Sequence, residues 1–167
     1  MVTSPTPALA GAHGWDQASS IGRDAIVLAA LGYPALQGDW KGDKQAALGM
    51  GSAFALTGLL KVTVHETRPD GSNRQSFPSG HTSVSFAAAA TLEKRYGWQI
   101  GVPAHLLAAF VGVARVKARK HYVRDVIAGG LIGEASGLLL SSKRDARTQW
   151  VPWGDTHSAG ATVALRF

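Results

Sequence analysis

The sequence has no cysteine among its 167 residues, and this absence excludes several kinds of chemistry. Disulfide bonds, thiolate nucleophiles and cysteine-ligated zinc sites all require a thiol. Charged residues are few, at 17%, whereas hydrophobic residues make up 46%, so the chain is not expected to be disordered. Its length suits one domain with a sizeable core.

Acidic residues are scarcer than basic ones, with 11 Asp and Glu against 17 Lys and Arg, which gives a formal net charge of +6. The basic residues are spread over several motifs and do not form one long run. Such a balance favours anionic partners, either small substrates or anionic membrane surfaces. Aromatic residues do not interleave with the basic ones and no nucleic-acid motif is present, so we expect no nucleic-acid partner.

Long hydrophobic runs are also missing. A membrane-spanning helix needs about 20 mostly apolar residues, but the longest stretch without Asp, Glu, Lys or Arg, residues 96–114, contains Gln99, Pro103 and His105. The mean hydropathy is +0.03. We therefore expect a soluble helical domain, with membrane association as the alternative. No basic segment leading into an apolar run follows Met1, so a secretory leader is not visible. A cytoplasmic protein would show no leader at this position, and neither would an exported protein whose numbering starts after its leader has been removed.

Helical periodicity is present along most of the chain and predicts an all-α fold, a single-domain bundle of about five to six helices with a short C-terminal extended segment. The expected helices cover residues 15–36, 46–64, 79–96, 103–116 and 124–142. Residues 1–14 are expected to form a flexible tail, which leaves 15–167 as the domain. Alternation in Thr162–Phe167 predicts a short strand or an extended arm lying on the helices. Twenty glycines and many alanines favour closely packed helices.

The first of three motifs joins two cations. Lys61 is followed, after six intervening residues, by Arg68 and Pro69. This separation is nearly two helical turns, so both cations can project from one helix face before the proline ends the helix. A solvated basic helix end is the alternative, because cations suit that end of the helix dipole.

The second motif is Pro78-Ser79-Gly80-His81, immediately before a predicted helix. Ser79 can cap this helix, and Gly80 allows the backbone to approach a ligand closely. The free N–H groups of a first helical turn favour an anion, and a histidine at this point can give a proton to a departing oxygen. An ordinary capped turn with a surface histidine is the alternative.

The third motif places Arg115 six positions before His121 and Asp125 four positions after it. His121 and Asp125 are one helical turn apart and can hydrogen-bond on a common face. Arg115 is roughly 240° from His121 around a continuous helix, so the three residues meet only if the chain breaks between them. Residues 117–120 are the expected break. A basic inter-helix loop with an ion pair is the alternative.

Together, the three motifs resemble the signature of the type 2 phosphatidic acid phosphatase (PAP2) superfamily, which includes bacterial acid phosphatases, lipid phosphate phosphatases and vanadium haloperoxidases. The family pattern is K-x6-RP, then PSGH, then SR-x5-H-x3-D. This sequence departs from it at Ala114, where the family usually has Ser. The resemblance implies the helical bundle of that family and a metal-independent phosphatase activity.

The resemblance also implies a role for each matching residue. His121 would be the nucleophile that forms a phosphohistidine, and His81 would protonate the leaving alkoxide and then deprotonate the attacking water. Asp125 would hold one ring N–H of His121. The implied phosphate-binding residues are Lys61, Arg68, Ser79, Gly80 and Arg115. No metal or other cofactor is implied, and vanadate is expected to inhibit by mimicking the transition state.

Two other functions stay open. A vanadium-dependent haloperoxidase would use the same anion pocket with vanadate as its cofactor. A non-catalytic anion-binding module would not need His81, His121 and Asp125 together, so their joint presence disfavours it.

The expected substrate is a phosphorylated small molecule or a lipid phosphate or diphosphate, and a lipid would need an apolar groove formed by the second, fourth and fifth helices. The resemblance places the protein in the bacterial periplasm or at the membrane, with surface association possible.

Overall fold

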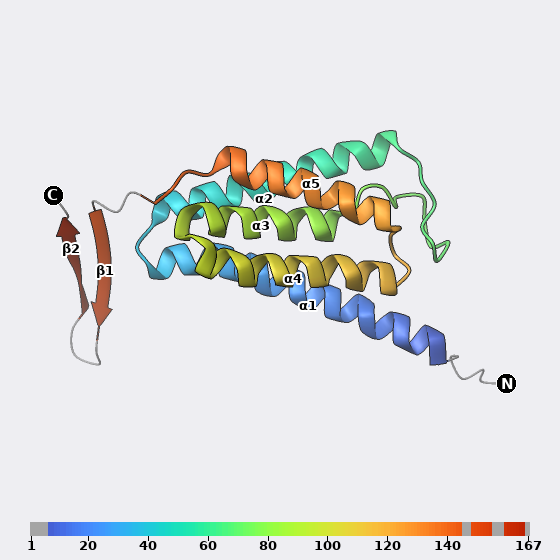
Figure 1. Cartoon of the computed structure of the whole chain (residues 1–167), viewed down its shortest axis with the longest axis horizontal. Helices are drawn as coiled ribbons and strands as arrows, with labels where there is room; N and C mark the ends of the chain where they lie inside the picture. Colours follow the sequence, from blue (N-terminus) through green and yellow to red (C-terminus); the bar gives the residue numbers. More distant parts are fainter. Residues whose placement is uncertain (1–6, 145–147, 155–158, 166–167) are drawn as a thin grey trace.

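The computed structural model describes residues 7–144, 148–154 and 159–165, which form five helices followed by a two-stranded hairpin (Figure 1). The helices are α1 (Pro7–Leu36), α2 (Trp40–Thr63), α3 (Gly80–Tyr96), α4 (Trp98–Lys117) and α5 (Val123–Leu140). The predicted all-α bundle is confirmed, and each expected helix is present with shifted ends. The helices alternate in direction, so the 64–79 loop and the α4–α5 turn lie at the same end of the bundle.

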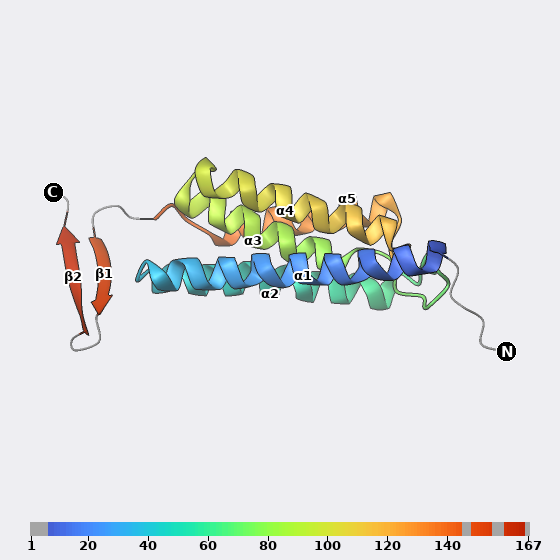
Figure 2. The ribbon, with the colours of Figure 1, turned by 90° about the horizontal axis from the view of Figure 1, so that it is seen from below.

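The central helix is α3, which packs against all four of the others (Figures 1 and 2). Its middle is a run of four fully buried alanines, Ala87–Ala90. Because alanine adds little bulk, the surrounding helices approach closely. The closest approach is to α5, where a Cβ added at Gly133 would lie 2.0 Å from the Ser83 carbonyl oxygen and one at Gly129 would lie 2.5 Å from the Ser79 carbonyl oxygen. The predicted close packing through small residues is confirmed.

The N-terminal prediction needs a correction. Helix α1 begins at Pro7, so residues 7–14 are helical and do not form a flexible tail. Proline is favoured at a first helical position because its missing N–H has no intrahelical acceptor there. The rest of the predicted tail, residues 1–6, lies outside the described residues.

The C-terminal strand prediction is confirmed for residues 162–165, while 166–167 lie outside the described residues. Strand β2 (Ala159–Leu165) pairs antiparallel with β1 (Thr148–Gly154), with Trp150 opposite Val163. The hairpin lies beyond the end of the bundle (Figure 1), so the strand does not lie on the helices as expected. Its backbone hydrogen bonds go to a second strand, and this is how an isolated extended segment satisfies its polar groups.

The outer surface of the bundle is rich in large apolar side chains. Exposed Leu, Ile, Val, Phe and Trp residues occur along α1, α2, α4 and α5. Helices α2 and α4 are long and apolar enough to cross a membrane, with best 18-residue windows of mean hydropathy 1.3 and 1.4. Only 28% and 33% of those windows are buried inside the bundle. A core helix of a soluble protein would be mostly buried, so this surface fits the membrane alternative better than the soluble expectation.

A network of buried charges closes the end of the bundle from which the hairpin leaves. Arg95 uses all three of its side-chain nitrogens there. Nε and Nη2 donate to the carboxylate of Asp39 at 2.9 and 2.5 Å, and Nη1 donates to Gln45 Oε1 at 2.5 Å and to the Ser142 carbonyl at 2.9 Å. The Tyr96 hydroxyl donates to the same carboxylate at 2.7 Å. This end is therefore tied together by a cation whose donors are all used.

Candidate active site

The three sequence motifs meet at the other end of the bundle. A cavity of about 700 Å³ opens there among α1, α2, α3 and the α4–α5 turn. Six of the residues singled out from the sequence line it: Lys61, Arg68, Gly80, His81, Arg115 and His121. Segments far apart in the chain therefore surround one basic cavity.

The first motif reaches the cavity by a different route from the one expected. Helix α2 ends at Thr63, with Val64 as its C-cap in an extended conformation, so Lys61 is in the last turn and Arg68 is in the following loop. The expectation that one helix face carries both cations is wrong. The backbone N–H of Arg68 donates to the Asn73 carbonyl at 3.0 Å, and the loop turns the chain back toward Lys61. The Lys61 ammonium donates to the Gln75 carbonyl at 2.7 Å, which ties α2 to this loop.

The second motif begins α3, but its serine does not line the cavity. Ser79 is fully buried; its N–H donates to the Asp125 carbonyl at 3.0 Å and its hydroxyl pairs with that of Thr82 at 2.9 Å. The side chain makes no N-cap hydrogen bond, so the expected side-chain cap is absent. The N–H of Ser79 thus holds the start of α3 against α5, while its hydroxyl bonds to the first turn of α3 itself. The N–H groups of Gly80 and His81 belong to the first helical turn, where no intrahelical acceptor exists.

The third motif breaks where the spacing predicts. Helix α4 ends at Lys117, and Arg119 adopts φ = 58° in the turn before α5 begins at Val123. The Lys120 N–H donates to the Arg115 carbonyl at 3.1 Å. This tight turn brings His121 back beside Arg115, and both side chains are almost fully buried.

The imidazole of His121 is held by a backbone carbonyl. Its Nδ1 lies 2.7 Å from the carbonyl oxygen of Ser76 and 3.6 Å from Asp125 Oδ2. A carbonyl only accepts, so Nδ1 carries the proton and Nε2 keeps a free lone pair. Asp125 instead accepts from the Ser76 hydroxyl at 2.5 Å and from the Tyr122 N–H at 2.9 Å. The expected direct bond from Asp125 to His121 is therefore replaced by an indirect one, in which Asp125 fixes Ser76 and Ser76 fixes the ring.

The surroundings of His121 keep its ring neutral. Burial, and after it the positive charges of Arg115, Lys61 and Arg68, lower the pKa of His121 below its ordinary value, against a smaller opposing effect of the Ser76 carbonyl. A neutral imidazole with a free Nε2 is the form that can act as a nucleophile.

Two guanidinium groups at the cavity have unused donors. Within the part of the chain that the structure describes, the buried Nε atoms of Arg68 and Arg115 have no hydrogen-bond partner. Buried N–H groups without partners are costly, so such donors point to a missing acceptor. The residues present therefore suit a tetrahedral oxyanion, which arginine binds with two parallel hydrogen bonds.

Helix α1 forms a wall of the cavity that the motifs do not reveal. Asp16, Ser20, Arg23 and Asp24 line the cavity from one face of this helix. Arg115 Nη1 donates to Asp16, and Arg23 Nη1 donates to His81 Nε2 at 3.0 Å. The only sequence signal for this wall is the spacing of polar residues by three or four positions, which places them on one helix face.

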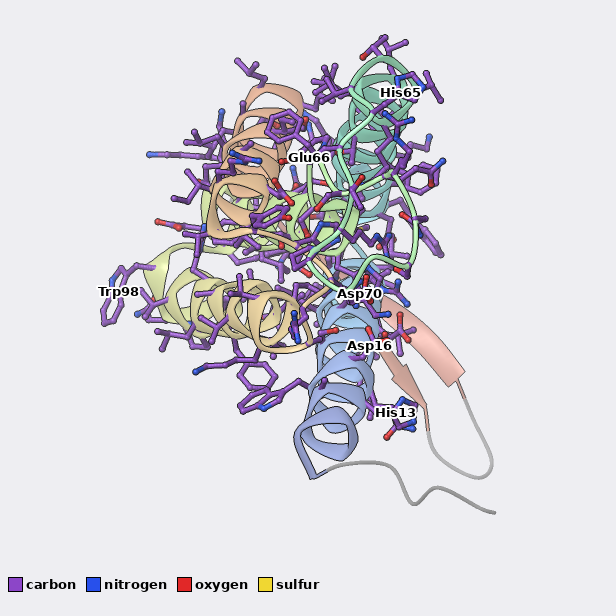
Figure 3. All side chains as sticks on the ribbon, turned by 90° about the vertical axis from the view of Figure 1, so that its right-hand side faces the viewer. His13, Asp16, His65, Glu66, Asp70 and Trp98 are labelled. Carbon is purple, nitrogen blue, oxygen red and sulfur yellow. The ribbon has the colours of Figure 1, made fainter. Side chains whose placement is uncertain are left out.

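The loop over the cavity is tied down by surface ion pairs. Lys120, which also lines the cavity, donates to Asp70 at 2.7 Å, and Arg124 pairs with Glu66. Figure 3 looks at this end of the molecule and shows Asp16 and Asp70 near one another, whereas His65 lies at the outer edge. His65 is exposed and lies outside the cavity.

Two further expectations concern a metal ion and an apolar groove for a lipid. In the described residues no three His, Asp or Glu side chains are grouped closely enough to hold a metal ion, and metal independence stays a prediction. The apolar residues of the cavity, Val27, Phe54 and Val84, come from α1, α2 and α3, so α2 contributes to the cavity as expected for a lipid groove, whereas α4 and α5 contribute no apolar residue to it. A separate apolar groove of about 600 Å³ lies between α4 and α5.

The chain is similar to known phosphatases. A model of the PAP2 superfamily matches residues 70–149. The lipid A 1-phosphatase of Porphyromonas gingivalis is 34% identical over 97 residues, which are 56% of this chain and 22% of that protein. The lipid A 4'-phosphatase of Helicobacter pylori is 30% identical over 117 residues, covering 63% of this chain and 59% of that protein. The chain thus spans between about a fifth and three fifths of the length of these relatives.

Two solved structures share the fold. Aquifex aeolicus LpxE superposes with a TM-score of 0.67 at 24% identity, covering 82% of this chain and 87% of that one. The first transmembrane PAP2-type phosphatidylglycerolphosphate phosphatase from Bacillus subtilis has a TM-score of 0.61 at 25% identity, covering 77% and 74%. Both likenesses extend well beyond the motifs, over most of the helical bundle.

Proposed function

We propose that this chain belongs to the PAP2 superfamily and is a phosphatase that hydrolyses the phosphate ester of a membrane lipid through a phosphohistidine. The observation that carries the proposal is the His121 ring, held neutral with its Nδ1 proton on the Ser76 carbonyl at 2.7 Å. Its free Nε2 belongs to a cavity lined by Lys61, Arg68 and Arg115. Lipid A phosphatases among the relatives support the phosphate ester as the reacting bond.

The first step forms a bond between His121 Nε2 and phosphorus and breaks the bond from phosphorus to the leaving oxygen. Lys61, Arg68 and Arg115 stabilise the charge on the equatorial oxygens, which is the main demand of phosphoryl transfer. A leaving alkoxide needs a proton, which His81 can give only when its Nε2 is protonated. The charge that develops on the imidazole of His121 is stabilised by the Ser76 carbonyl and, behind it, by the Asp125 carboxylate.

The second step releases the phosphate. A water molecule attacks phosphorus from the side the leaving group has vacated, and His81 accepts the proton of that water. The N–P bond breaks, its electron pair returns to His121 Nε2, and inorganic phosphate leaves. Protons and bonds balance over the two steps without a metal ion.

The lipid part of the substrate follows from the position of the site. Val27, Phe54 and Val84 continue the cavity away from the phosphate-binding residues along α1, α2 and α3. An apolar tail fits there, and helices α2 and α4 are long enough to cross the bilayer. We place the site at one membrane face, with the periplasmic face as the specific proposal.

Trapping the intermediate tests this function. The detergent-solubilised protein, mixed with radiolabelled phosphatidic acid and quenched with alkali, should retain an alkali-stable, acid-labile phosphate. The His121→Ala variant should retain none and release no phosphate, while His65→Ala, an exposed histidine outside the cavity, should behave as the unmodified protein. Unchanged turnover in His121→Ala contradicts the proposal. Bromide oxidation with vanadate and peroxide, in the absence of phosphatase activity, would support a haloperoxidase instead.

The membrane face has its own test. Because the chain has no cysteine, Arg74→Cys in the 64–79 loop provides a single thiol at the site end. A membrane-impermeant maleimide should label it in intact spheroplasts. Labelling only after lysis would place the site at the cytoplasmic face.

A further inference from the structure

Arg23 of α1 is the cavity cation that lies outside all three motifs and contacts a proposed catalytic group. Its Nε and Nη2 donate to Asp24 Oδ1 at 2.9 and 2.7 Å. Its Nη1 lies 3.0 Å from His81 Nε2. One edge of the guanidinium is thus fixed by Asp24, and the remaining nitrogen is directed to the histidine at the cavity.

The contact between Arg23 Nη1 and His81 Nε2 indicates the protonation state of His81. A guanidinium only donates, so Nε2 of His81 accepts and the ring is neutral. The same nitrogen lies 3.4 Å from the Ser20 hydroxyl. Burial, Arg115 and Arg23 lower the pKa of His81 to about 3, against the opposing charges of Asp16 and Asp24. In this state His81 has no proton on Nε2 to give to an alkoxide.

In-line attack decides which part of a substrate meets Arg23. His121 attacks from one side of phosphorus, so the leaving oxygen departs on the opposite side, where His81 handles its proton. Arg23 Nη1 is one hydrogen bond away from His81 Nε2. Whatever is attached to the leaving oxygen therefore passes within reach of this guanidinium.

We propose that Arg23 is a specificity-determining residue that binds negative charge on the leaving group, so that the site prefers a diphosphate over the monophosphate of the same alcohol. The proposal rests on the phosphatase function proposed above. Lys61, Arg68 and Arg115 already match the charge of the transferred phosphoryl group. Arg23 adds a cation on the leaving side. Its Nη1 carries a second N–H besides the one directed to His81, and an oxygen of a leaving phosphate can accept from it, whereas a carbon chain cannot.

The neutral state of His81 agrees with this assignment. A leaving phosphate departs without the full proton transfer that an alkoxide needs, so the first step does not require a protonated His81. In the second step the neutral ring takes the proton of the attacking water and then passes it to the released phosphate, which returns the ring to its neutral state. The bond that breaks first is the phosphoanhydride bond, and its electron pair stays on the leaving phosphate beside Arg23.

The test compares two substrates with one tail. Phosphate release from farnesyl diphosphate and from farnesyl monophosphate is measured in detergent micelles, and the ratio of the two kcat/KM values is the readout. Arg23→Gln should lower that ratio by about 10- to 100-fold, the effect of losing a charged hydrogen-bonded pair. Arg23→Lys, which keeps the charge but loses the planar guanidinium group, should give an intermediate ratio. Arg74→Gln, which removes an exposed arginine outside the cavity, should leave the ratio unchanged.

Each outcome has a distinct meaning. Equal losses on both substrates in Arg23→Gln and Arg23→Lys would show a structural role and overturn the assignment of Arg23, as would an unchanged ratio. Because the ratio compares substrates within one variant, partial misfolding does not alter it. Failure of the unmodified protein to release phosphate from either substrate would instead count against the proposed function itself.

Discussion

The two ends of the bundle use arginine in opposite ways. At the closed end, every side-chain nitrogen of Arg95 has an acceptor, and the carboxylate of Asp39 is surrounded by donors. At the site end, Arg68 and Arg115 keep buried Nε donors without partners in the described part of the chain. A saturated cation stabilises the fold, whereas an unsaturated one is held ready for a ligand. The difference predicts which substitutions affect stability and which affect activity.

The largest expected effect is at the closed end. Arg95→Met leaves the Asp39 carboxylate buried without its cation, and removing one partner of a buried pair costs about 3–5 kcal/mol of unfolding free energy. Thermal and denaturant unfolding followed by circular dichroism measure this loss. Lys41→Met, an exposed cation at the same end, is the control and should change little. Equal stability of the two variants would contradict the comparison.

A smaller effect, on activity instead of stability, is expected at the site end. Arg68→Gln removes a side chain whose Nε has no partner among residues 7–144, 148–154 and 159–165, so the free energy of unfolding should not fall. The loss of transition-state stabilisation should lower kcat/KM by about 100- to 1000-fold. Steady-state phosphate release and the same unfolding measurements check both parts. A strongly destabilised Arg68→Gln would mean that this cation, like Arg95, serves the fold.

Vanadate binding tests whether the arginines at the site end bind an anion. An anion that binds only the folded site stabilises it by about 2.7 kcal/mol at a hundred times its dissociation constant. The melting temperature should therefore rise with vanadate in the unmodified protein and in Lys41→Met. In Arg68→Gln the rise should be largely lost at the same concentration. A rise of equal size in Arg68→Gln would show that vanadate binds elsewhere.

The smallest expected effect separates the two ends by pH. The folded pKa values of His81 and His121 lie below their ordinary value of 6.5. Between about pH 6.5 and 4 the two histidines are therefore protonated in the unfolded chain but stay neutral in the folded protein. Stability should fall as pH falls through this window. For Asp39, burial alone would raise the pKa, but hydrogen bonds from Arg95 and Tyr96 lower it below 3.8, so its contribution is lost only in more acidic solution.

Melting curves between pH 8 and 4 test this separation. The unmodified protein should lose more stability over the range than a His81→Gln/His121→Gln double variant. Identical pH dependence in the two proteins would show that the site histidines titrate alike in the folded and unfolded states.

Sequence reasoning predicted the members of the site better than their contacts. The spacing of Arg115, His121 and Asp125 predicted the break between α4 and α5, because three residues at those positions cannot meet on one helix. The Ser76 carbonyl that orients His121 was missed, since every residue has a carbonyl and no motif marks the one that is used. Ser79 was assigned to the phosphate, but its N–H bonds to Asp125 of α5 and its hydroxyl to Thr82 of α3, contacts that only the folded backbone reveals.

The helix boundaries were also predicted less well than the helices themselves. Helical periods predicted five helices, whereas the helical start at Pro7 and the loop position of Arg68 depend on local backbone conformation that the period does not encode. The α1 wall, with Arg23 and Asp24, follows from tertiary packing alone.

The glycine contacts between α3 and α5 have a consequence for redesign. Gly129 and Gly133 lie against the backbone carbonyls of Ser79 and Ser83, so these two helices meet without an adjustable side chain between them. The spacing between the backbone segments that carry His81, on α3, and His121, just before α5, is therefore determined by main-chain contacts at these glycines. Engineers who wish to admit a bulkier headgroup should leave that seam alone and vary α1, where the lining consists of replaceable side chains.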